Sequence, residues 1–309
     1  MNEATTARPS LPEAWLTQAR HYPLAAAGLA IASLALLGLL LQSAISLASG
    51  NAAIGLRFGA LAGLAGFGAT TLGAAAGLVL RNVGQKAEDS MLGFAAGMML
   101  AASSFSLILP GIDAARGMTG SGLLAALTVV LGLALGVMLM LGMDRFTPHT
   151  HESCGDCGPG AERLNRVWLF VLAITLHNLP EGMAMGVSFA QGDVSVGLPL
   201  ATAIAIQDIP EGLAVVMALR AAGVRNLQAV LLAAASGLME PLGALLGLGL
   251  TGGFPLAYPV GLGLAAGAMI FVVSHEVIPE THRNGHQTPA TLGLMLGFAL
   301  MMVLDTALG

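Results

Sequence analysis

The stretch from Leu176 to Gly182 reads LHNLPEG, and it interrupts an otherwise apolar segment of the chain. Later in the sequence, Ile206 to Gly212 read IQDIPEG, a near-copy with a polar pair, an apolar residue, proline, glutamate and glycine in the same order. Proline and buried charge are both unfavourable inside a lipid-embedded helix. Their repetition therefore marks a candidate functional site, and the segments around the two motifs decide the fold.

Composition places the whole chain in a membrane. Of its 309 residues, 56% are hydrophobic and 9% are charged, whereas a soluble domain carries about 25% charged residues. Nine apolar windows are long enough for a helix to cross a bilayer, which takes roughly 20 residues, and none alternates as a barrel strand would. An all-α polytopic membrane protein is predicted, with spans at 24–48, 58–80, 90–112, 117–143, 167–192, 194–219, 226–250, 254–279 and 287–308.

The basic residues orient these spans. Cytoplasmic segments of membrane proteins are enriched in Lys and Arg. With the N-terminus inside, only Arg57 and Arg116 fall outside, and the inner segments hold Arg8, Arg20, Arg81, Lys86, Arg145, Arg163, Arg166, Arg220, Arg225 and Arg283. The N-terminus is therefore predicted to be cytoplasmic and the C-terminus periplasmic or extracellular. A cleaved signal peptide is the alternative interpretation of the first window.

Helix geometry gathers the polar residues of each motif on one face. Residues three and four apart are neighbours on a helix, so each glutamate lies beside the polar pair that precedes it. The two motif-bearing spans run in opposite directions, and both motifs lie near the middle of the bilayer. The sequence thus predicts one cage formed by His177, Asn178, Glu181, Gln207, Asp208 and Glu211.

The chemistry of this cage favours a divalent metal ion. Pro180 and Pro210 leave the carbonyl groups of Leu176 and Ile206 without their usual helical donors. Glu240, which also precedes a proline, adds another carboxylate. Buried carboxylates need compensation, and imidazole with carboxylate and amide oxygens suits Zn²⁺, and also Cd²⁺, Fe²⁺ or Mn²⁺.

A second, weaker echo joins two other spans. Ala95 to Met99 read AAGMM and Ala265 to Met269 read AAGAM, and Ser104 and Ser274 follow at the same offset. These spans also run in opposite directions, and inverted repeats around a midplane site are typical of transporters.

The paired motifs HNLPEG and QDIPEG resemble the ZIP (Zrt/Irt-like protein) family of divalent metal transporters, closely enough to indicate a bacterial member. The resemblance covers residues 55–309, and it implies eight helices in a 3+2+3 inverted-repeat arrangement, a binuclear midplane site, uptake into the cytoplasm and a homodimer. The helix at 24–48 is then an extra transmembrane helix that follows a cytoplasmic segment, 1–23. The resemblance also implies that the six cage residues and Glu240 bind metal. Gln207 departs from the family, whose fifth span often begins this motif with histidine.

Further polar residues flank the predicted spans. The inner set forms either an interfacial cap or an exit path for metal, and it comprises His275, Glu276 and His286. The outer set, which fits an entrance path, comprises Asp305, Asp113 and Met99, although Met99 also fits a hydrophobic core. The cytoplasmic loop at 144–166 contains four candidate metal-binding residues, with a redox pair or a plain linker as alternatives: His149, His151, Cys154 and Cys157.

Transmembrane uptake of a divalent metal, by alternating access in the inner membrane of a bacterium, is the predicted function. A metal-selective channel is an alternative. An intramembrane metallohydrolase would need the H-E-x-x-H spacing, which this chain lacks, so we expect no enzyme activity. The expected partners are divalent metal ions, lipid and a second copy of the chain, with no organic cofactor and no nucleic acid.

Overall fold

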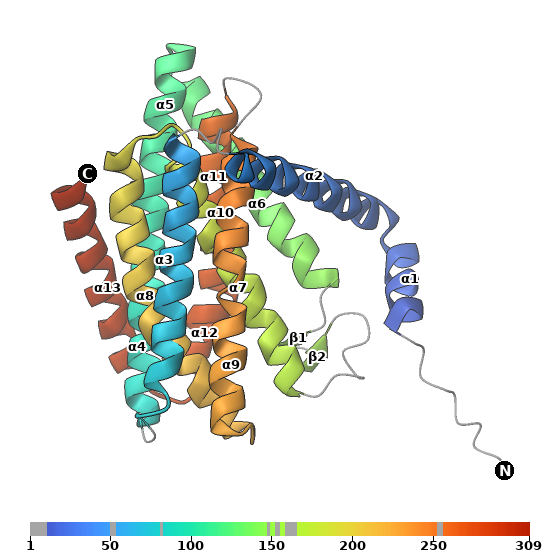
Figure 1. The fold of residues 1–309 in the computed structure, drawn as a ribbon, viewed down its shortest axis with the longest axis vertical. Helices are drawn as coiled ribbons and strands as arrows, with labels where there is room; N and C mark the ends of the chain where they lie inside the picture. The colour runs from blue at the N-terminus through green and yellow to red at the C-terminus, as the bar shows by residue number, and fades with distance from the viewer. Residues whose placement is uncertain are drawn as a thin grey trace.

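The computed structural model describes residues 11–49, 54–80, 83–146, 149–151, 155–157, 166–251 and 256–309, and helices account for most of them (Figure 1). Long helices occupy all nine predicted windows. They are α2 (Pro23–Ala48), α3 (Ile54–Ala76), α4–η1–α5 (Gln85–Ala102, Ser103–Ile108 and Leu109–Thr119), α6 (Gly122–Phe146), α7 (Arg166–Ser188), α8 (Val194–Ala221), α9–α10 (Asn226–Ser236 and Met239–Leu250), α11–η3–α12 (Ala257–Val272, Val273–Val277 and Ile278–His282) and α13 (Gln287–Leu308).

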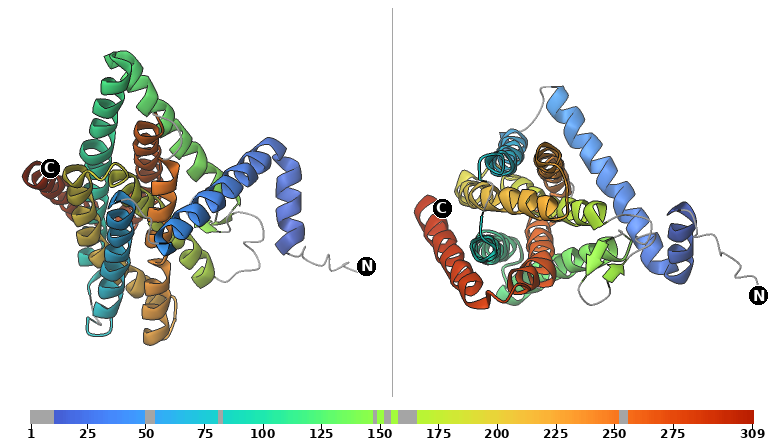
Figure 2. Two further views of the ribbon diagram at one scale, coloured as in Figure 1. Left: turned by 45° about the horizontal axis from the view of Figure 1, so that its top comes forward. Right: turned by 90° about the horizontal axis from the view of Figure 1, so that it is seen from below.

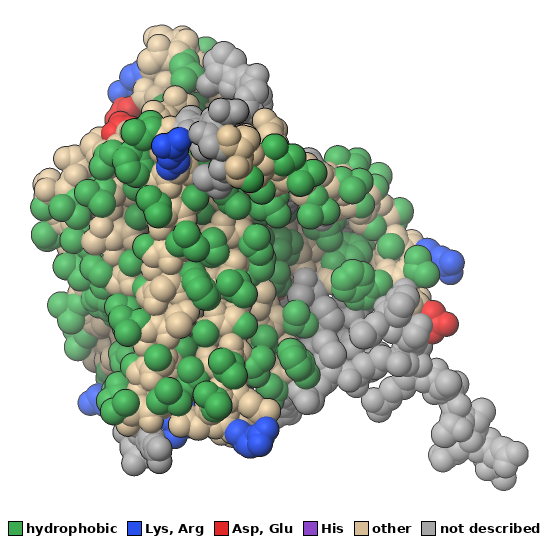
Figure 3. Space-filling model, viewed as in Figure 1, with side chains coloured by type: hydrophobic (Ala, Val, Ile, Leu, Met, Phe, Trp, Pro, Cys, Tyr) green, Lys and Arg blue, Asp and Glu red, His purple; other side chains and the backbone are tan. Residues whose placement is uncertain are grey.

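Length and composition identify candidate membrane spans among the described helices. Seven of the described helical segments are long and apolar enough to cross a bilayer. Hydrophobic side chains cover the middle of the face drawn in Figure 3, and Lys and Arg side chains lie towards its ends and on the α1 arm. The prediction of an all-α polytopic membrane protein is confirmed.

The predicted extra helix, α2, follows a short helix, α1 (Leu11–His21), and lies across the outside of the bundle, crosswise to α3 (Figures 1 and 2). It packs mainly on α10, where the Ser43 hydroxyl donates a hydrogen bond to the carbonyl of Leu245 at 3.0 Å. A hydroxyl bonded to a backbone carbonyl of another helix is a common contact between membrane helices. This contact fixes one point of α2 against the bundle.

The same pattern of helix packing occurs twice in the bundle. Helix α3 packs on α8 as α10 packs on α7, and α4 packs on α13 as α11 packs on α6. The weaker sequence echo lies on two of these helices, α4 and α11, which run in opposite directions (Figure 1). Both helices continue into a π-helical stretch, η1 in one and η3 in the other. The echo at 95–99 and 265–269 therefore corresponds to a structural repeat.

The motif-bearing helices lie inside this frame. Helix α7 contacts α3, α8, α9, α10 and α11, and α8 contacts α3, α4, α9 and α13. A large hydrophobic core beside them contains several fully buried methionines, including Met98, Met185 and Met269. Burial of both motif faces follows from this central position.

The loop predicted at 144–166 is shorter in the structure than predicted, and it contains β-strands. Helix α6 ends at Phe146 and α7 begins at Arg166. Between them β1 (His149–His151) pairs antiparallel with β2 (Gly155–Cys157), so that His149 lies opposite Cys157 along the backbone. Cys154 lies outside the described residues. An all-helical prediction did not include this hairpin, because three-residue strands leave too short a pattern to recognise.

Candidate metal centre

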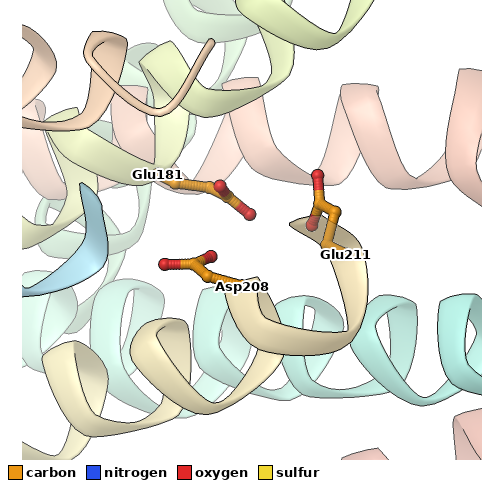
Figure 4. Close-up of side chains that lie close together, drawn as sticks. All are labelled: Glu181, Asp208 and Glu211. Atoms are coloured by element: carbon orange, nitrogen blue, oxygen red, sulfur yellow. The ribbon is translucent and has the colours of Figure 1, made fainter. Parts of the chain in front are cut away.

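Three carboxylates converge from the two motif-bearing helices. Glu181 comes from α7, Asp208 and Glu211 come from α8, and the three side chains point toward one another (Figure 4). One carboxylate oxygen from each lies within 4.8 Å of the others. The spacing of three residues places Asp208 and Glu211 on one face of α8, and the contact with α7 brings Glu181 opposite them. This distance is close enough for one ion to touch all three groups.

Because the cluster is buried, the charged form of its carboxylates is unfavourable unless a positive charge lies nearby. Glu181 and Asp208 are each 2% exposed, and Glu211 is half-buried. The sequence contains no Lys or Arg between residues 167 and 219, so neither helix supplies a cation at this depth. Carboxylates held together inside a membrane need protons or a cation to offset their mutual repulsion. A divalent cation meets that requirement, because carboxylate oxygens are common ligands of such ions.

The remaining polar residues of the two motifs surround the carboxylates. The Gln207 amide nitrogen donates a hydrogen bond to Glu181 Oε1 at 2.6 Å. His177 Nδ1 lies 3.3 Å from Glu276 Oε2 on η3, and the imidazole is close enough to interact with the charge of Glu211. The structure thus brings both motifs together, as the helical spacing predicted, and adds Glu276 to their neighbourhood.

Asn178 and Glu240 also adjoin members of the carboxylate cluster. A narrow pocket there is lined by Thr70, Ile174, Asn178, Asp208, Glu211, Gly212, Val215 and Ser236. Glu240 is fully buried beside Asp208, and its Oε1 accepts a hydrogen bond from the Thr70 hydroxyl at 2.5 Å. Glu240 is contributed by α10, so a third helix supplies a carboxylate to the site.

Three buried oxygen atoms of the site receive no hydrogen bond from the described part of the chain. They are Gln207 Oε1, Asp208 Oδ2 and Glu240 Oε2. An unpaired buried acceptor costs roughly 1–3 kcal/mol, so such atoms are rare unless they bind something. Their position around the carboxylate cluster fits oxygen coordination of a cation.

The glycines that end the two motifs allow close helix contacts at the site. A Cβ atom on Gly182 would overlap the carbonyl oxygen of Glu240, and one on Gly212 would overlap the carbonyl oxygen of Thr70. Glycine is therefore required for α7 to approach α10, and for α8 to approach α3, at this level of the bundle.

The predicted outer residues do not form one cluster. Asp305 accepts a hydrogen bond from the Ser106 hydroxyl on η1 at 2.6 Å. Met99 is 1% exposed and packs in the hydrophobic core, and its place in an entrance path stays a prediction. Asp113 is exposed, and the nearest Arg116 nitrogen lies 3.9 Å from its carboxylate.

The predicted inner residues do not form one cluster either. Glu276 reaches His177, whereas the His275 ring packs against Phe271 with 4.9 Å between ring centroids. His286 Nδ1 lies 2.8 Å from Asp89 Oδ2, and Asn284 donates to the other oxygen of Asp89 at 3.0 Å. Glu276 is thus the inner residue that adjoins the candidate metal centre, and the exit path stays a prediction.

Sequence reasoning missed four residues near the predicted ones, of which three contact predicted residues and Asn284 contacts Asp89. Thr70 and Ser106 are hydroxyl residues in apolar helices, where such residues are common and carry little signal. Asp89 and Asn284 lie near helix ends, where polar residues are expected. Extension of the repeat to α3 and α10 would have found Thr70, because Leu72-Gly73-Ala74 and Leu242-Gly243-Ala244 are identical.

Comparison with known proteins agrees with the geometry of this site. The model of the family described as ZIP Zinc transporter matches residues 146–305, which contain both motifs and Glu240. Zinc transporter ZIPB of Bordetella bronchiseptica is 62% identical over 100% of both chains. Zinc transporter GufA of Myxococcus xanthus is 44% identical over 81% of this chain and 99% of its own, and Zinc transporter ZIP11 of Homo sapiens is 30% identical over 79% and 95%. With this likeness over its full length, and with both motifs in one buried site, the chain belongs to the ZIP family of zinc transporters.

Proposed function

We propose that this protein takes up Zn²⁺ across the bacterial inner membrane into the cytoplasm, through the metal centre between α7, α8 and α10. The observation that carries the proposal is the convergence of Glu181, Asp208 and Glu211 within 4.8 Å in a buried site. The names of the relatives, all of them zinc transporters, support zinc as the substrate. Cd²⁺, Fe²⁺ and Mn²⁺ are candidate competitors, because the same donor types also bind them.

The ligand set supports a binuclear centre. Carboxylates can bridge two ions, and three of them lie together here. Four further donors lie around them, which are His177, Asn178, Gln207 and Glu240. We propose that these seven residues bind the transported metal. No organic cofactor and no catalytic step belong to this mechanism.

Burial of the ligands supports a carrier in preference to an open channel. Apart from half-buried Glu211, the ligand side chains are between 0% and 8% exposed. An ion that binds there must be enclosed and then released by a change of conformation, which is alternating access. The charge bias of the loops supports a cytoplasmic N-terminus, and the family resemblance extends the proposal to a homodimer.

Transport in proteoliposomes tests this function. The purified protein should carry Zn²⁺ into vesicles, and parallel assays with Cd²⁺ and Mn²⁺, with and without pH and voltage gradients, would define selectivity and driving force. Glu181→Ala and Glu211→Ala should each lower the uptake rate at least about tenfold, since each removes a charged ligand. Glu13→Ala is the matched control, because this carboxylate is exposed on α1 and lies outside the cluster. Wild-type uptake by both glutamate variants would refute the proposal.

A further inference from the structure

A buried hydrogen bond connects Glu240 to a helix outside the two motifs. The Thr70 hydroxyl on α3 donates to Glu240 Oε1 at 2.5 Å. Thr70 is 5% exposed and Glu240 is 0% exposed, so water cannot readily replace this donor. A buried hydrogen bond to a carboxylate is short and about twice as strong as one between neutral groups.

The internal repeat relates the two partners to each other. Thr70 to Ala74 read TTLGA, and Glu240 to Ala244 read EPLGA at a constant offset along the chain. Their helices pack equivalently, because α3 lies on α8 as α10 lies on α7. Gly212 abuts the carbonyl of Thr70 just as Gly182 abuts that of Glu240. Thr70 therefore occupies the position equivalent to Glu240, with a hydroxyl where the other repeat carries a carboxylate.

The hydroxyl leaves the two carboxylate oxygens of Glu240 in different environments. Oε1 accepts the hydrogen bond from Thr70, whereas Oε2 is buried and receives none from the described residues. The carboxyl group lies beside Asp208, and Thr70 itself borders the pocket that Asp208 and Glu211 line. A donor fixed on Oε1 restricts rotation of the carboxylate and so fixes the position of Oε2, which lies where a Cβ at Gly66 of α3 would overlap it.

We propose that Thr70 is a positioning residue of the metal site, which sets zinc affinity by orienting Glu240. The proposal rests on the proposed function, since it takes Glu240 as a ligand. Outer partners of metal-binding carboxylates commonly tune affinity in this way, and their loss typically costs 10–100-fold. Thr70 acts through Glu240 and need not touch the metal.

The test compares the zinc affinity of the detergent-solubilised protein with the KM and Vmax of uptake. Thr70→Val keeps the shape of the side chain and removes the donor, and it should weaken zinc binding and raise KM by about tenfold. Thr70→Ser keeps the hydroxyl and should stay within about twofold of wild type on the same reasoning. Thr71→Val is the matched control, because the Thr71 hydroxyl oxygen makes no hydrogen bond in the described structure and should leave affinity unchanged.

A double-variant cycle separates positioning from simple helix contact. In a Glu240→Ala background, Thr70→Val should cause no further loss of affinity, because the group that it orients is gone. Equal additional loss in that background, or a Thr70→Val protein with wild-type zinc affinity and only a lower Tm, would overturn the proposal. Thr70→Ala is a second variant without the donor if the valine does not fit.

The binding measurement also distinguishes the two proposals. Thr70-dependent zinc binding in a protein that does not transport would contradict the proposed function alone. Zinc uptake that is unaffected by Thr70→Val would contradict the role of Thr70 alone.

Discussion

Gln207 offers two different atoms to its surroundings. Its amide nitrogen donates to Glu181 Oε1 at 2.6 Å, whereas its Oε1 receives no hydrogen bond from the described residues. The nitrogen therefore holds a neighbouring carboxylate, and in the proposed metal site the oxygen is the candidate ligand atom. Oxygen ligands favour ions such as Mn²⁺ more than imidazole does.

Gln207→His should shift metal preference toward Zn²⁺. The change replaces an amide oxygen with an imidazole nitrogen, which suits Zn²⁺ better than Mn²⁺. We expect the ratio of Zn²⁺ to Mn²⁺ uptake to rise by about threefold or more, which corresponds to somewhat less than 1 kcal/mol. Competitive uptake of the two ions in proteoliposomes measures the ratio. Gln191→His, on the exposed turn between α7 and α8, is the control, and an unchanged ratio in Gln207→His would contradict the ligand role.

At the scale of helices, the close contact between α7 and α10 depends on a missing side chain. Gly182→Ala would place a Cβ against the carbonyl of Glu240, so the helices must move apart. Overpacking of this kind costs about 1–3 kcal/mol, and we expect Tm to fall by roughly 3–10 °C, with loss of zinc uptake.

Gly68→Ala on α3 is the matched control for this helix contact. A Cβ at Gly68 meets no atom within 4 Å, and alanine is the better helix former, so Tm should stay level or rise. Thermal unfolding in detergent, followed by fluorescence or light scattering, measures both variants. Equal behaviour of the two would show that the contact at Gly182 is not limiting.

The hairpin between α6 and α7 is expected to modulate transport rather than to carry it. Replacement of His149, His151, Cys154 and Cys157 by Ser removes four candidate metal donors from a segment outside the predicted spans. Uptake should persist, while its rate or its response to zinc preloaded inside the vesicles should change. Complete loss of uptake in folded protein would assign the loop to the obligatory path, and Thr150→Ala with Ser153→Ala controls for the change of loop sequence.

For the whole molecule, the loop charges predict which end faces the cytoplasm. The sequence has two cysteines, Cys154 and Cys157, so two serine substitutions provide a cysteine-free background. Ala222→Cys and Gln191→Cys then place single thiols at exposed turns at opposite ends of α8.

An impermeant thiol reagent added to intact cells with a permeable outer membrane should label Gln191→Cys and spare Ala222→Cys. Disruption of the inner membrane should make both accessible. The reverse pattern would invert the topology, and with it the direction of uptake proposed here.

The sequence by itself determined most of the membrane spans and the local clusters of polar side chains. Apolar length sets a span, and the helical repeat places residues three and four apart on one face, so both depend only on nearby residues. The extent of single helices was less well predicted. The third window was expected at 90–112, but the helical segment runs from Gln85 to Thr119, since polar residues at its ends extend the helix beyond the hydrocarbon.

Only the tertiary structure decided which distant residues meet. Glu276 beside His177, Thr70 on Glu240 and Ser106 on Asp305 are pairs far apart in the chain. Their meeting depends on how glycine- and alanine-rich helix faces fit together, and many such faces in this chain look alike. Close packing between helices is a property of paired surfaces, so a single segment of sequence cannot specify its partner.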